Sequence, residues 1–135
     1  MSKKWYLYEI LDKLDMYFSN GNGNFKNFVL CKSDKIGGLG NYMLRTCYCR
    51  KKEKIQDRFL FDSDNLVVII GFDVHLKKER LKENKTYNID EYKTKMQIII
   101  TDIDNYISEK KWCEEIGYDN IFIWYGKEDK FVEEI

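Results

Sequence analysis

The chain has 135 residues with 44% apolar and 16% aromatic side chains, and its 23 Lys and Arg balance 23 Asp and Glu. Such a chain can bury enough apolar surface to fold without disulfides or metal ions, so the composition excludes intrinsic disorder. The zero net charge argues against a strong sequence-independent nucleic-acid binder and against a highly acidic DNA mimic. We expect a single domain over residues 1–135.

The cellular compartment is expected to be a reducing one. No stretch approaches the roughly 18 apolar residues of a membrane-spanning helix, and the N-terminus lacks the apolar core of a signal peptide. Four Cys in a chain of this size do not form a secreted disulfide framework. The lack of Pro and the abundance of Lys, Ile, Asn and Asp follow A/T-rich coding, so we expect the cytoplasm of a bacterial host.

The first expected element is a helix with Ser2 as its N-cap and Gly21 near its end. Its apolar residues recur at helical spacing, and they include Leu7, Ile10, Leu11 and Leu14. Strands are then expected over residues 25–32, 42–49, 58–61 and 66–72. The last of these is the most apolar run in the chain and fits a central, buried strand.

A second helix is expected from Asn88 to Ile107. Asn88 and Glu91 have the spacing of a capping box, and apolar residues follow at i, i+3 and i+4 steps. Gly117 ends this region, residues 121–125 form a final strand, and residues 127–135 are an acidic tail that is expected to fray. The order α-β-β-β-β-α-β predicts an α+β fold with an antiparallel sheet of about four to five strands and both helices on one face.

The sequence motifs identify neither a reaction nor a cofactor, and we expect no bound metal ion. Cys31, Cys47, Cys49 and Cys113 lack the close spacing of a zinc site and are interpreted as apolar core residues. Asp62-Ser63-Asp64 is interpreted as a turn. Asp102 and Asp104 are expected on different faces of the second helix, because they are two positions apart.

Catalysis by a metal-dependent nuclease is the weakest of three functional alternatives. Asp73 follows the apolar strand, with His75 and Lys77 just beyond it, and Glu9 could supply a second carboxylate. Nothing in the spacing requires these residues to meet, so no catalytic residue is assigned.

A nucleic-acid-binding domain is the second alternative. Basic residues beside tyrosines are what single-stranded nucleic-acid binders use. The residues of this basic stretch are Arg45, Arg50, Lys51, Lys52, Lys54 and Arg58.

The leading hypothesis is a binding protein that uses its C-terminal segment. Residues 1–101 contain 19 Lys and Arg against 13 Asp and Glu, whereas residues 102–135 contain 4 against 10. This second segment interleaves acids with aromatics, a composition suited to contact with a basic partner. The expected partner-binding residues are Trp112, Glu114, Glu115, Tyr118, Asp119, Tyr125, Glu128 and Asp129. Since Trp124 and Tyr125 point to opposite sides of a strand, one of them should pack inward.

In size, composition and lack of motifs the chain resembles small inhibitors carried by phages and mobile elements, including anti-CRISPR proteins and the immunity partners of bacterial toxins. No motif carries this resemblance, so it assigns no residue roles. It implies a non-catalytic protein that acts on a host or cognate protein, such as a nuclease or a nucleoprotein complex. Such a protein would occupy the partner's nucleic-acid channel or prevent a conformational change.

Overall fold

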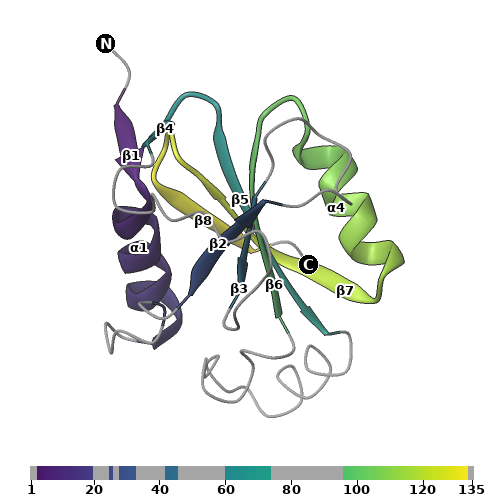
Figure 1. Ribbon diagram of the computed structural model, residues 1–135. Coiled ribbons are helices and arrows are strands. Elements are labelled where there is room, and N and C mark those ends of the chain that lie inside the picture. Colours follow the sequence, from purple (N-terminus) through teal and green to yellow (C-terminus); the bar gives the residue numbers. More distant parts are fainter. Residues whose placement is uncertain are drawn as a thin grey trace.

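The computed structural model describes residues 3–19, 25, 28–32, 42–45, 60–73 and 96–133, and every structural statement below concerns these residues. The N-terminal part contains β1 (Lys4–Tyr6), α1 (Leu7–Ser19), β2 (Val29–Lys32), β3 (Tyr42–Arg45) and β4 (Leu60–Asp62). The remainder contains β5 (Leu66–Asp73), β6 (Met96–Asp102), α4 (Tyr106–Glu115), β7 (Tyr118–Tyr125) and β8 (Lys130–Glu133). The predicted α+β class is confirmed (Figure 1).

The main sheet has six strands in the order β2-β3-β6-β5-β7-β8, and every neighbouring pair is antiparallel. The apolar run at Leu66 forms β5, which lies between β6 and β7 as a central strand should. Its side chains from Leu66 to Ile70 are all buried. A second, two-stranded sheet pairs β1 with β4. The prediction of a buried central strand is therefore confirmed.

The two helices cover opposite faces of the main sheet, so the prediction that both lie on one face was wrong (Figure 1). On one face Val68 and Ile70 pack with Leu14 of α1 in the larger core cluster. On the other face Val67 and Ile69 pack in a cluster that includes Cys113 of α4. The central strands are apolar at successive positions because each face has its own helix to bury it against.

The chain from Lys4 to Tyr6 is a strand, so the first helix begins at Leu7 and Ser2 is not its N-cap. Trp5 is buried, and its Nε1 donates a hydrogen bond of 3.0 Å to the backbone oxygen of Gly126. This long-range contact draws the N-terminal residues into an extended conformation alongside the turn between β7 and β8, and the sequence spacing gave no sign of it.

The expected helix over residues 88–107 was wrong over residues 96–105, because residues 96–102 form β6 and residues 103–105 form a turn, whereas Tyr106 and Ile107 do begin a helix, α4. A strand buried on both faces has no alternation of apolar and polar residues, and its apolar run matched the helical template by chance. The chain then turns at Asp102, whose Oδ1 accepts a hydrogen bond of 2.9 Å from the backbone N–H of Asn105. Residues 88–95 lie outside the described residues.

The helix that follows, α4, ends as Gly117 predicted. Gly117 has a φ of +94°, a left-handed conformation that glycine adopts without strain. Beyond β7 the tail expected to fray contains β8, which pairs with β7 from Phe122 to Tyr125. The sequence also predicts seven core residues, namely Leu11, Leu14, Val68, Ile70, Ile99, Ile103 and Ile123, and six of them are buried. Ile103 is the exception, at 47% exposed, because it lies in the turn after β6 rather than on a helix face.

Candidate functional site

The aromatic residues expected at a binding surface gather around α4. Trp112, Tyr118 and Tyr125 are half-buried against the core cluster beneath that helix. Tyr125 meets Tyr106 edge to face, with 6.2 Å between the ring centroids. Trp124 points to the other face of β7 and is buried. These rings therefore hold α4 on the sheet and expose only part of their surface.

Some acids of the same segment are exposed on the surface, and one of them, Asp129, makes contacts that stabilise the fold. Glu114 and Glu115 are exposed in the last turn of α4, which contains no basic residue. Glu128 is also exposed, in the turn between β7 and β8. Asp129, by contrast, accepts a hydrogen bond from Trp124 Nε1 at 3.1 Å and pairs with Lys13 Nζ at 2.8 Å.

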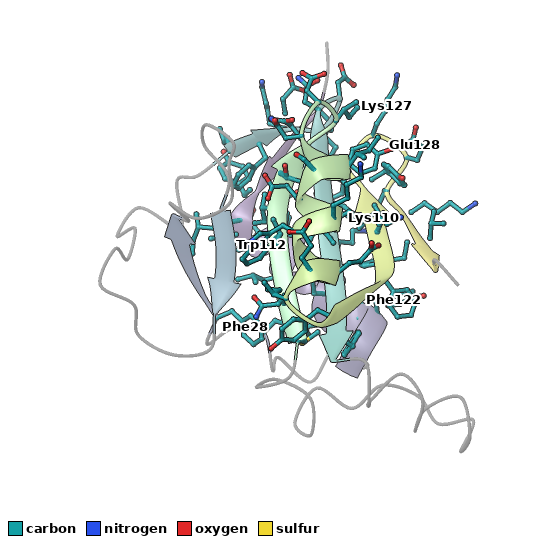
Figure 2. The ribbon with its side chains drawn as sticks, turned by 90° about the vertical axis from the view of Figure 1, so that its right-hand side faces the viewer. Phe28, Lys110, Trp112, Phe122, Lys127 and Glu128 are labelled. Carbon is teal, nitrogen blue, oxygen red and sulfur yellow. The ribbon has the colours of Figure 1, made fainter. Side chains whose placement is uncertain are left out.

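The α4 surface also includes three exposed isoleucines, of which Ile103 was predicted to be a core residue. Ile103 precedes the helix, Ile107 is 57% exposed in its first turn, and Ile116 is 42% exposed at its C-terminal end. Figure 2 shows α4 in front of the sheet with Lys110 and Trp112 on its two flanks. The candidate site is the outer surface of α4, comprising Ile103, Ile107, Glu114 and Glu115.

Beneath this surface α4 buries one carboxyl and one thiol. Glu109 is 2% exposed and Cys113 is fully buried. The pKa of the Cys113 thiol is raised from 9.0 to about 12, mainly by burial and in smaller part by the nearby charges of Glu109 and Glu114. A thiol that stays protonated is a poor nucleophile and a poor metal ligand, so Cys113 fits its predicted structural role.

The pKa of Cys113 predicts how stability depends on pH. The unfolded chain releases the thiol proton above pH 9.0, whereas the folded chain holds it until about pH 12, so the free energy of unfolding falls between these values. This loss should be about 1.4 kcal/mol per pH unit. Urea unfolding of wild type and Cys113→Ala at pH 8 and pH 10 in reductant would measure it. The stability difference between the two proteins should shrink at the higher pH, and a constant difference would contradict the prediction.

The other candidate residues lie in turns, at strand ends or outside the described residues. Asp62 and Asp64 form a turn, as predicted, in which Asp62 Oδ1 accepts the backbone N–H of Asp64 at 3.1 Å. Asp102 and Asp104 belong to a strand end and a turn rather than to a helix, so their predicted placement was wrong. Among the described residues no group of three His, Cys, Asp or Glu side chains is arranged to hold a metal ion.

Of the expected partner-binding residues, Asp119 lies in β7. The nuclease, nucleic-acid-binding and four-cysteine sites cannot be assembled from the described residues. Asp73 ends β5, Cys31 is in β2 and Arg45 ends β3. The other residues of these sites lie outside the described part of the chain: Cys47, Cys49, Arg50, Lys51, Lys52, Lys54, Arg58, His75 and Lys77.

The fold and the α4 surface thus describe an α+β domain with a candidate docking face. No protein-family model, no curated protein and no solved structure matches this chain. Within the described ranges no helix is long and apolar enough to cross a membrane.

Proposed function

We propose that this protein is a non-catalytic inhibitor that binds a macromolecular partner through the outer surface of α4. The observation that carries the proposal is the pair of exposed acids, Glu114 and Glu115, in the C-terminal turn of that helix. In this position the acids oppose the dipole of their own helix, and we propose that contact with a basic partner offsets this cost.

The helix dipole makes the C-terminal turn of α4 unfavourable for acids. The C-terminal end of a helix carries a partial negative charge, so an acid there is unfavourable by roughly 0.3–1 kcal/mol. Glu109, in the first turn of the same helix, lies at the end where the dipole favours an acid. Residues that oppose local stability are expected to occur at functional sites.

The charge distribution supports a basic partner. Residues 102–135 contain 10 acids against 4 basic residues. Acids on one surface attract a basic surface at long range and accelerate association in a salt-dependent manner. Basic surfaces line the nucleic-acid channels of nucleases and nucleoprotein complexes, and an acidic helix in such a channel would block the substrate. We therefore propose that the partner is an enzyme or complex of this class.

Charge reversal tests the proposal. Wild type, the double variant Glu114→Lys/Glu115→Lys and the control Asp12→Lys would each be immobilised and exposed to lysate of the source organism. Asp12 suits the control because it is exposed on α1, across the sheet from α4. We expect wild type and control to retain one stoichiometric basic protein, with at least about tenfold slower association for the double variant. Stability should be unchanged or raised by less than about 2 kcal/mol, since both acids leave the unfavourable end of the dipole.

Three results would contradict the proposal. One is equal retention of the partner by the double variant and by wild type. Another is retention of nucleic acid in place of protein, which would favour the basic stretch of residues 45–58. The third is a clear loss of stability in the double variant with unchanged association, which would show that the acids serve the fold. The retained enzyme must also lose activity when wild type is added.

A further inference from the structure

We draw no further inference here: the strongest candidate, the exposed surface patch that Tyr6 of β1 forms with Leu60 of β4 and with Tyr8 at the start of α1, carries nothing, because Lys4 beside it is already paired with Asp62 and nothing in the described residues shows what covers these side chains.

Discussion

Replacing Trp5 with Ala is expected to lower the free energy of unfolding by about 3–5 kcal/mol. The indole is buried, it forms a T-shaped contact with the Trp124 ring at a centroid distance of 5.0 Å, and its Nε1 donates to the Gly126 oxygen. Lys3 Nζ also lies 3.7 Å from the centroid of the Trp5 ring. The substitution would therefore open a cavity and leave the Gly126 oxygen without its donor. Urea unfolding followed by circular dichroism would measure the loss.

Two further variants separate the contributions of Trp5. Trp5→Phe keeps most of the buried area and loses the Nε1 donor, so it should cost about 1–3 kcal/mol. Tyr8→Ala, in a residue 52% exposed on the adjoining helix, should change stability by about 0.5 kcal/mol or less. A small effect of Trp5→Ala would mean that the N-terminal strand does not dock beside the turn between β7 and β8.

Leu14→Ala is expected to be similarly damaging, at about 2–5 kcal/mol, whereas Ile103→Ala should cost less than about 1 kcal/mol. Leu14 is 1% exposed and packs in the larger core cluster between α1 and the sheet. Ile103 loses little buried surface because about half of its side chain already faces solvent. The two variants carry similar chemical changes, so the comparison tests the position of each side chain.

The same comparison distinguishes two interpretations of residues 96–107. If these residues formed one long helix, Ile103 would share a buried face with Ile99 and both substitutions would be costly. If β6 ends at Asp102, as the structure has it, only Leu14→Ala is costly. A loss above about 2 kcal/mol for Ile103→Ala would contradict the turn at residues 103–105.

Trp5 and the β7–β8 turn show how the two ends of the chain are joined. Gly126 approaches β5 so closely that a Cβ there would lie 2.9 Å from Leu66 Cβ, so only glycine fits without displacing its neighbour. Its N–H donates to the Leu66 oxygen at 2.9 Å while its oxygen accepts from Trp5. Asp129, in the same turn, is held by Lys13 and Trp124. These contacts make Asp129 part of the fold, which favours Glu114 and Glu115 as the acids to test for binding.

The local sequence was enough to predict an element where the spacing of its apolar residues matches the face that it buries, or where a glycine marks its end. Leu7, Ile10, Leu11 and Leu14 recur at helical spacing, and they are buried along one side of α1. The apolar run of β5 predicted a central strand, and Gly117 predicted the end of the second helix. In each case a few neighbouring residues are enough to satisfy one physical requirement, either burial of a face or a left-handed turn.

Tertiary structure decided the features whose partners are distant in sequence. Trp5 becomes part of a strand because its indole N–H donates a hydrogen bond to the backbone oxygen of Gly126. The residues around Lys4 give no sign of this distant partner. Ile98, Ile99 and Ile100 form a strand because β3 and β5 pair on either side of them. The sequence composition identified the acids of the candidate site, but it did not reveal the exposure of Ile103 and Ile107. Exposure depends on which face of α4 meets the sheet, and that face is chosen by packing across the whole molecule.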